Sequence, residues 1–311
     1  FFCTLFLLGG VSSSLAGLEL ENRFRRPVAL AWVGDGLLAV ANRDAGSVSL
    51  VDVAKGKVLA ESVIGKKLSD LAAIRDGRFL LATDEERSEL ILLETNEGKS
   101  FEVRHRVAVS NSPVDVKIDP TGVFATVTSL WARRVSLFRI DAQNATLLRE
   151  QVTDLPFPPH RQWLHPDGAK LVVTDAFADQ IAVLSLPALS LSVTRILPGH
   201  NIGGLCLAPN GLDLLVSHQI LNPLVPTTRP RVFWGTVMRN AITGIELEDL
   251  FDKTREPSSP IVRWKRYPVG ENGKGAGEPG PMLFGKSGVF VLGIRGTGEG
   301  VVGDGLGGDW K

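Results

Sequence analysis

Histidine has the widest chemical range of any residue in this chain, and the sequence contains five: His105, His160, His165, His200 and His218. A neutral imidazole binds metal ions or the axial position of a haem, and it titrates near neutral pH. His160, His200 and His218 map to segment ends that we predict to lie on one face of the protein. Three imidazoles on one face could share a metal ion. Because His160 and His200 belong to different repeats, we favour a single histidine, His200 or His218, that contacts a ligand or partner. We predict no metal site and no catalytic residue.

Arginine, tryptophan and asparagine side chains accumulate in the same predicted loops. Together with His160, His200 and His218, the candidate residues for binding a ligand or partner are Trp131, Arg133, Arg134, Arg161, Asn201, Arg229, Arg231 and Trp234. Simpler explanations remain open for some of them. Arg133 and Arg134 could be a solvated loop pair, and Trp234 could only pin its loop to the protein body.

Composition and motifs exclude several kinds of chemistry. Lys+Arg and Asp+Glu both number 34, so the formal net charge is zero and no nucleic-acid binding driven by a basic excess is expected. The sequence contains no Gly-x-Ser-x-Gly, P-loop or His-Glu-x-x-His motif. Its two cysteines, Cys3 and Cys206, do not form Cys-x-x-Cys-His, so this chain has no site for covalent attachment of a c-type haem.

A repeated turn signal places the candidate residues on a regular scaffold. The turns end at glycines 41 to 46 residues apart, which are Gly36, Gly77, Gly122, Gly168 and Gly211, and a weaker turn ends at Gly288. One short apolar segment precedes each of the first five glycines and further strand-like segments follow it. Four short strands per repeat with tight turns are typical of a β-propeller blade. The sequence therefore predicts an all-β propeller of about five and a half four-stranded blades, with an incomplete ring, as in a fragment.

The repeat also predicts which loops share a face. In a propeller, the loops from second to third strands and those between blades lie together and form the usual ligand funnel, and the candidate binding residues map to this face. Asp70, Asp115 and Arg161 occupy one repeat position, seven residues before the glycine. They could surround the mouth of the funnel or only cap the first strands with hydrogen bonds. The fifth repeat carries a loop insertion at about residues 219–239 and a second expansion at about 249–260.

The first residues resemble a secretory signal. Phe1–Leu8 is almost wholly apolar, and Ser14 and Ala16 would occupy the −3 and −1 positions of a cleavage site. A buried apolar strand is the alternative. We therefore predict a signal at residues 1–16 and a propeller domain at 17–311, in an exported protein of the periplasm or the extracellular space. No other segment is apolar over about 20 residues, so no stable membrane span is expected.

One blade pattern resembles a known family. Pro27–Val53 combines Pro-x-x-hydrophobic, Val-Ala-Asn and Ser-Val-Ser-Leu-Val-Asp, and Pro-Asp-Gly occurs in a second matching segment that begins at Pro166. These motifs resemble the YVTN family of bacterial β-propeller repeats over about residues 27–300, which implies the fold rather than a function. The segment from His200 to Gln219, with the Trp-Gly insertion after it, resembles exported propellers joined to di-haem, peroxidase-like c-type cytochrome modules.

The sequence thus favours an exported, non-catalytic binding module that presents its funnel face to a protein partner or a small ligand and holds no cofactor. The resemblance implies an alternative: the propeller part of a larger c-type cytochrome oxidoreductase whose haem-binding region lies outside this chain, with a cytochrome c module as partner. A third interpretation is a hydrolase of a small ester or lactone with a central metal, but the sequence offers no recognisable ligand set for it.

Overall fold

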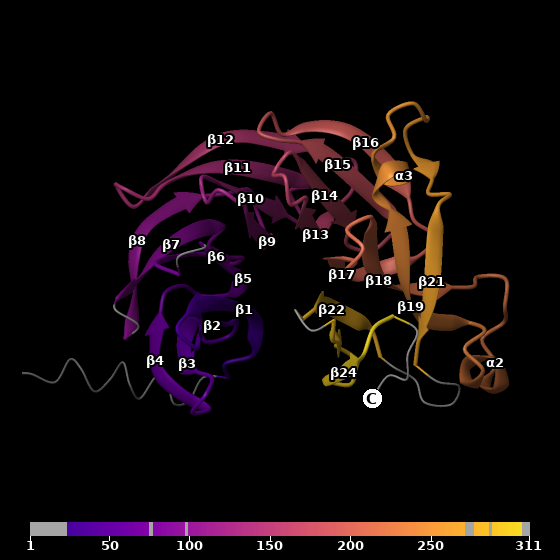
Figure 1. Cartoon of the computed structure of the whole chain (residues 1–311), viewed down its shortest axis with the longest axis horizontal. Helices are drawn as coiled ribbons and strands as arrows, with labels where there is room; N and C mark the ends of the chain where they lie inside the picture. Colours follow the sequence, from indigo (N-terminus) through magenta and orange to yellow (C-terminus); the bar gives the residue numbers. More distant parts are fainter. Residues whose placement is uncertain (1–23, 75–76, 97–98, 271–276, 286–287, 307–311) are drawn as a thin grey trace, which may run out of the picture.

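The computed structural model of the chain describes residues 24–74, 77–96, 99–270, 277–285 and 288–306. In this part the chain forms a β-propeller, with six small sheets that follow one another in sequence order around a common centre (Figure 1). The prediction of an all-β propeller is therefore confirmed. The predicted signal at residues 1–16 and the first residues of the predicted 17–311 domain lie outside the described residues.

Blades 1 to 3 are antiparallel sheets of four strands each. Blade 1 contains β1 (Pro27–Gly34), β2 (Leu37–Asn42), β3 (Ser47–Asp52) and β4 (Lys57–Val63). Blade 2 contains β5 (Leu68–Ala73), β6 (Phe79–Asp84), β7 (Glu89–Asn96) and β8 (Ser100–Ala108). Blade 3 contains β9 (Pro113–Ile118), β10 (Phe124–Ser129), β11 (Arg134–Asp141) and β12 (Thr146–Asp154). The first strand of each blade is innermost in the ring (Figure 1).

Blades 4 to 6 depart from this regular pattern. Blade 4 contains β13 (Pro159–Leu164), β14 (Lys170–Asp175), β15 (Gln180–Ser185) and β16 (Ser190–Ile196), and a short fifth strand, β20 (Ser259–Pro260), pairs in parallel with β16. Blade 5 contains β17 (His200–Leu207), β18 (Asp213–Leu221), β19 (Met238–Glu246) and β21 (Trp264–Val269). Blade 6 contains three described strands, β22 (Pro279–Phe284), β23 (Phe290–Ile294) and β24 (Glu299–Gly303).

Repeated backbone hydrogen bonds define the two faces of the propeller. On the face that we call the funnel face, the loop after the second strand bonds to the segment that enters the same blade: Arg43 N to Arg26 O, Glu85 N to Lys67 O, Leu130 N to Ser112 O and Ala176 N to Pro158 O. On the opposite face, the end of the third strand bonds to the turn between the first two strands: Val53 N to Gly36 O, Thr95 N to Arg78 O, Ile140 N to Val123 O and Leu186 N to Ala169 O. The first four repeats are therefore equivalent in three dimensions.

The predicted turn glycines are required by backbone conformation. Gly77 has a φ of +70°, in the left-handed region that favours glycine. A Cβ at this position would also overlap with the backbone carbonyl of Val33 in the preceding blade. The turn can therefore approach the neighbouring blade closely only because residue 77 has no side chain.

One apolar core fills each junction between consecutive sheets. At the junction of blades 2 and 3, Leu81 and Phe138 are completely buried and pack with Val116. Similar clusters lie between blades 1 and 2, 3 and 4, 4 and 5, and 5 and 6. Because burial of one such side chain contributes about 1.5–3 kcal/mol, these five clusters are the main source of stability.

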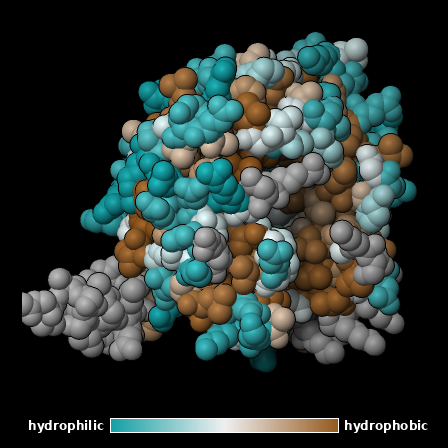
Figure 2. Space-filling model, turned by 60° about the vertical axis from the view of Figure 1, so that its left-hand side comes forward, coloured by the Kyte–Doolittle hydropathy of each residue, from teal (hydrophilic) through white to brown (hydrophobic). Residues whose placement is uncertain are grey.

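The first and last blades lack such a junction within the described residues. Leu30 of β1 is 63% exposed, whereas Leu71 and Val116, at the same repeat position of blades 2 and 3, are 5% and 0% exposed. Leu283, in β22 of blade 6, is 55% exposed. Figure 1 shows these two blades at the two ends of the arc, and Figure 2 shows apolar patches that reach the molecular surface between hydrophilic areas. The described residues thus form an open arc of six blades.

Both predicted expansions of blade 5 are ordered elements. The first extends the β18–β19 hairpin and carries the short helix α2 (Arg229–Phe233) at its end. The second contains α3 (Leu247–Phe251) and β20, and it crosses to blade 4, where the buried Arg195 donates to the carbonyl oxygens of Asp252 and Glu256. No helix among the described residues is long and apolar enough to cross a membrane.

Candidate functional site

Asp70, Asp115 and Arg161, which share one repeat position, lie together with Lys117 in a charged cluster at the centre of the ring. These residues lie on β5, β9 and β13, the innermost strands of blades 2 to 4. Lys117 Nζ lies 2.5 Å from Asp115 Oδ1 and 3.5 Å from Asp70 Oδ2, and Arg161 Nη1 lies 3.7 Å from Asp115 Oδ2. The same position holds alanine in blade 1 and glycine in blade 5, so the charged residues at this position come from blades 2 to 4. We call these four residues the central cluster.

Asp70, one of the two carboxylates of the central cluster, is buried and hydrogen-bonded to the protein backbone. Asp70 is 9% exposed and accepts a hydrogen bond from the backbone N–H of Val116, which joins blade 2 to blade 3. Burial raises the pKa of Asp70, while Lys117 opposes this rise and Asp115 adds to it. The bond to Val116 reaches the middle of β9 and not the end of a strand, so Asp70 links two inner strands, and a role of the shared position at the mouth of the funnel stays a prediction.

Arg161 differs from the other members because part of its hydrogen-bonding capacity is unused. Its Nε is buried and has no hydrogen-bond partner among the described residues, although its side chain is 25% exposed. A guanidinium N–H that is buried without a partner is costly, so an acceptor that reached it would be held strongly. Arg161 is thus the cluster member best placed to bind an anionic group.

His160, next to Arg161, is neutral in the folded protein. Burial, and after it the nearby positive charges of Arg161 and Arg295, lower the pKa of His160 to about 3. Its side chain therefore offers a neutral imidazole near the central cluster. Within the described ranges, no three His, Cys, Asp or Glu side chains lie close enough together to hold a metal ion.

Two exposed aromatic side chains stack on the funnel face. Trp131 is in the loop between β10 and β11, and Phe177 is in the equivalent loop of blade 4. Their ring centroids are 5.7 Å apart with an interplanar angle of 26°, and they are 63% and 52% exposed. Large aromatic rings at such exposure gain little from folding, whereas an apolar or planar ligand could cover them. The sequence indicated both loops but not the stacking.

His218 is not on the funnel surface, which corrects its prediction as a ligand contact. It is completely buried in β18, where its Nε2 lies 2.7 Å from Thr243 Oγ1 and its Nδ1 lies 3.1 Å from the carbonyl oxygen of Gln219. The chain packs against this ring at Gly199, where a Cβ would overlap with the imidazole. Burial lowers the pKa of His218 to about 4, so this residue is a structural, uncharged histidine.

Acidification should destabilise the protein through His218. The imidazole has a pKa of about 4 in the folded protein and an ordinary pKa of 6.5 in an unfolded chain, so between these pH values the unfolded chain binds more protons. The stabilisation by the neutral imidazole is fully present above pH 6.5 and is lost as the pH falls toward 4. Between pH 7 and pH 4.5 we expect His218 to lower the free energy of unfolding by about 2–3 kcal/mol. Urea unfolding at both pH values should show this loss in the native protein and a smaller loss in His218→Asn. Equal losses in the two proteins would contradict a buried, neutral His218.

His200 and Asn201 begin β17 on the funnel-face side of blade 5. His200 pairs with Gln219, and the Asn201 side-chain amide donates to Gln219 Oε1 at 2.7 Å. Both residues are partly buried. Their position agrees with the predicted loop face, and their role in binding remains a prediction.

The remaining candidates lie away from the central cluster. Arg133 is exposed in the same loop as Trp131, and Arg134 pairs with the exposed Asp154 at 2.7 Å on the outer strands of blade 3. Arg229, Arg231 and Trp234 lie in or beside α2, at the outer rim of the ring (Figure 1). The structure therefore separates the insertion from the centre of the funnel with which the sequence grouped it.

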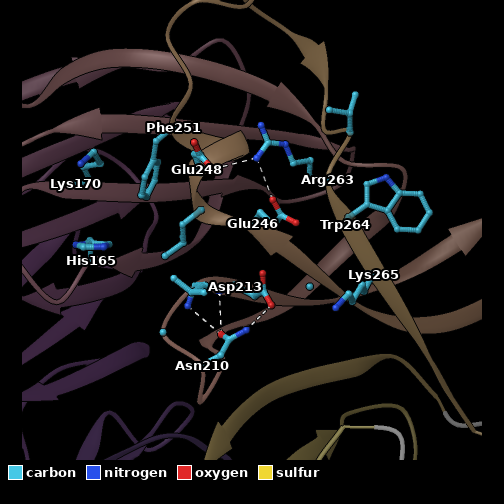
Figure 3. Close-up of a pocket in the computed structure, with 15 residues that line it drawn as sticks. His165, Lys170, Asn210, Asp213, Glu246, Glu248, Phe251, Arg263, Trp264 and Lys265 are labelled. Carbon is cyan, nitrogen blue, oxygen red and sulfur yellow. Dashed lines mark hydrogen bonds and ion pairs between the residues drawn. The ribbon is translucent and has the colours of Figure 1, made fainter.

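A pocket on the opposite face was missed by sequence reasoning. It has a volume of about 730 Å³ and lies between the turns of blades 4 and 5, α3 and β21 (Figure 3). Three of its charged side chains pair with one another, because Arg263 bridges Glu246 and Glu248 at 3.3 and 3.1 Å. His165 lines it and pairs with Asp167 at 2.7 Å. Only the second expansion of blade 5, which supplies α3, signalled its presence.

Comparisons with known proteins agree on the fold. A family model described as lactonase, 7-bladed beta-propeller, matches residues 35–159. A chain of hydrazine synthase from Kuenenia stuttgartiensis superposes with a TM-score of 0.76 at 19% identity and covers 96% of this chain and 79% of that chain. A catalytically inactive virginiamycin B lyase from Staphylococcus aureus with quinupristin gives 0.64 at 13% identity and covers 90% and 82%. No curated protein matches the chain.

These likenesses establish architecture and not activity. The fold is that of a β-propeller. The family match ends where blade 4 begins and spans less than half of the chain, and the solved structures are too distant in sequence to transfer a function. The resemblance to the YVTN family and the link to cytochromes stay predictions.

Proposed function

We propose that the chain is a binding module whose funnel face takes a ligand or partner segment that carries an aromatic or apolar group beside an anionic group. Two observations carry this proposal: the exposed Trp131–Phe177 stack on the funnel face, and Arg161 near the start of the inner strand β13, whose side chain is 25% exposed and keeps a buried N–H without a described partner. The stack would cover the planar group, and Arg161 would bind the anion.

The electrostatics of the central cluster favour binding over catalysis. Asp115 is buried and its carboxylate pairs with two cations, Lys117 and Arg161, so this carboxylate is not free to act on a substrate. His160 is held neutral with a pKa of about 3, well below the range in which a general base works best. An exported location and a protein partner, as the sequence predicts, are compatible with this role and belong to the same proposal.

N-acetyl-tryptophan, an aromatic carboxylate, tests both parts of the proposal. Titration calorimetry should detect its binding, and the amide of the same compound should bind about tenfold more weakly or worse, because it lacks the charge that Arg161 would hold. Trp131→Ala should weaken binding about threefold to tenfold, the worth of one aromatic contact. Arg161→Gln should abolish the difference between acid and amide.

Trp32→Ala is the matched control for this experiment. Trp32 is also exposed, at 57%, but lies in β1 of blade 1, away from the stack, so its replacement should leave binding unchanged. Thermal unfolding of each variant would verify that it remains folded. The proposal would be overturned if the native protein bound N-acetyl-tryptophan and its amide equally well. It would also be overturned if Trp131→Ala bound N-acetyl-tryptophan as tightly as the native protein does.

A second candidate is the propeller part of a larger oxidoreductase, as the sequence resemblance implies. The near-complete superposition on a chain of hydrazine synthase favours it, because that enzyme uses the same architecture. Any c-type haem would have to be attached outside this chain, which contains no Cys-x-x-Cys-His. The funnel face would then contact a cytochrome module in place of a small ligand. A lactone hydrolase, the third interpretation, has the family match in its favour and no identified catalytic group.

A further inference from the structure

The end of the β18–β19 hairpin exposes an unusual number of large apolar side chains. We call residues 221–238 the hairpin tip. Within it, the most exposed apolar side chains are Leu224 at 91%, Trp234 at 58%, Val232 at 55%, Phe233 at 55%, Met238 at 49% and Leu221 at 43%. Helix α2 contains no buried residue. The apolar groups of the tip are therefore displayed to solvent and do not serve the core of the protein.

The hairpin tip is held in shape by its own backbone. The N–H of Asn222 donates to the carbonyl oxygen of Val237 at 2.9 Å, and the N–H and hydroxyl of Thr236 both donate to that of Arg231, at 3.0 and 2.9 Å. Phe233 and Trp234 contact each other edge to face, with centroids 5.2 Å apart. The exposed rings therefore project from a defined turn structure.

Charge on the hairpin tip and its base has a single sign. From Gln219 to Ile245 the sequence contains Arg229, Arg231 and Arg239 and no Asp or Glu. All three arginines are exposed, and none forms an ion pair with another described residue. Since the whole chain has equal numbers of acidic and basic residues, this segment is a local basic and apolar surface on a neutral protein.

We infer that the hairpin tip docks on the surface of an anionic phospholipid membrane. Apolar side chains with flanking arginines bind the headgroup region by burying the former and pairing the latter with lipid phosphates, and tryptophan favours this interface. The tip protrudes at the outer rim of the ring (Figure 1), so it can reach a flat surface without obstruction from the blades. A protein partner would need a matching acidic cavity, whereas a lipid surface adapts to a protruding tip.

Vesicle flotation tests this inference with the full chain. Vesicles of phosphatidylcholine with about one third phosphatidylglycerol should carry the protein upward, and vesicles of phosphatidylcholine alone should not. Arg229→Gln with Arg231→Gln should weaken binding to the anionic vesicles about 25-fold, since each arginine near such a surface contributes about fivefold. Phe233→Ser with Trp234→Ser should weaken it about tenfold or more, because the apolar anchor is lost.

Leu148→Ser with Arg149→Gln is the matched control. Both residues are exposed on β12 of blade 3, outside the hairpin tip, and the double variant should float like the native protein. All changed side chains are exposed, so circular dichroism should confirm an intact fold in every variant. No binding to anionic vesicles, equal binding to both vesicle types, or native-like flotation of the tip variants would each overturn the inference. In the first case the tip would be assigned to a protein partner.

Discussion

Replacing Asp115 with alanine should lower the free energy of unfolding by about 3 kcal/mol. The carboxylate is 2% exposed and lies 2.5 Å from Lys117 Nζ and 3.7 Å from Arg161 Nη1. Its removal leaves two cations at the centre of the ring with one remaining carboxylate, Asp70, and loss of one partner of a buried pair costs about 3–5 kcal/mol. We expect the lower end of this range because the Lys117 side chain keeps 37% of its exposure to water.

Asp154→Ala gives the matched control for Asp115→Ala. Asp154 also pairs with an arginine, Arg134, at 2.7 Å, but its side chain is 78% exposed. Exposed pairs contribute about 0–1 kcal/mol, so this variant should unfold at nearly the native urea concentration. If both variants lost the same stability, the central cluster would not be the buried ionic network that the distances describe.

The fold was predictable because each blade repeats the same local code. An apolar strand, a glycine turn and a second apolar strand recur with little change, and Gly77 shows why: the turn requires a positive φ and closely approaches the preceding blade. Equivalence between repeats also predicted that Asp70, Asp115 and Arg161 would share one level of the ring. Counting from the turn glycine therefore located part of the site as well as the strands.

The other site features depend on side-chain packing, which the repeat does not encode. Lys117 could have been noted from the two-residue alternation that puts it on the same side of β9 as Asp115. The stacking of Trp131 on Phe177 joins loops of two different blades, which no local pattern predicts. His218 seemed to border a loop, yet β18 continues through it, and Gly199 allows the chain to close over its ring.

The insertions of blade 5 were found from spacing alone, but their destinations were not. The spacing of turn glycines shows how many residues are added and says nothing about the direction in which they project. Arg229 and Trp234 were therefore grouped with the funnel, although α2 lies at the outer rim. The second insertion crosses to blade 4, where β20 pairs with β16 and the buried Arg195 donates to the carbonyl oxygens of Asp252 and Glu256.

Leu71→Ala should lower the free energy of unfolding by about 2–5 kcal/mol, whereas Leu30→Ala should cost less than about 0.5 kcal/mol. The two leucines have the same side chain and the same repeat position, six residues before the turn glycine. Leu71 is 5% exposed because blade 1 packs on it, and Leu30 is 63% exposed because no described blade precedes it. The pair thus measures what one neighbouring blade contributes, with chemistry and strand position held constant.

Urea unfolding of both variants also tests the open arc. Val116, the next equivalent residue, is completely buried against blade 2, so Val116→Ala should be costly for the same reason as Leu71→Ala. If Leu30→Ala lowered the free energy of unfolding as much as Leu71→Ala does, the face of blade 1 that carries Leu30 would be covered in the folded protein. The arc would then be closed by a packing partner. A negligible loss would leave Leu30 and Leu283 as exposed apolar residues at the two ends of the arc, where an added sheet with apolar faces could bury both.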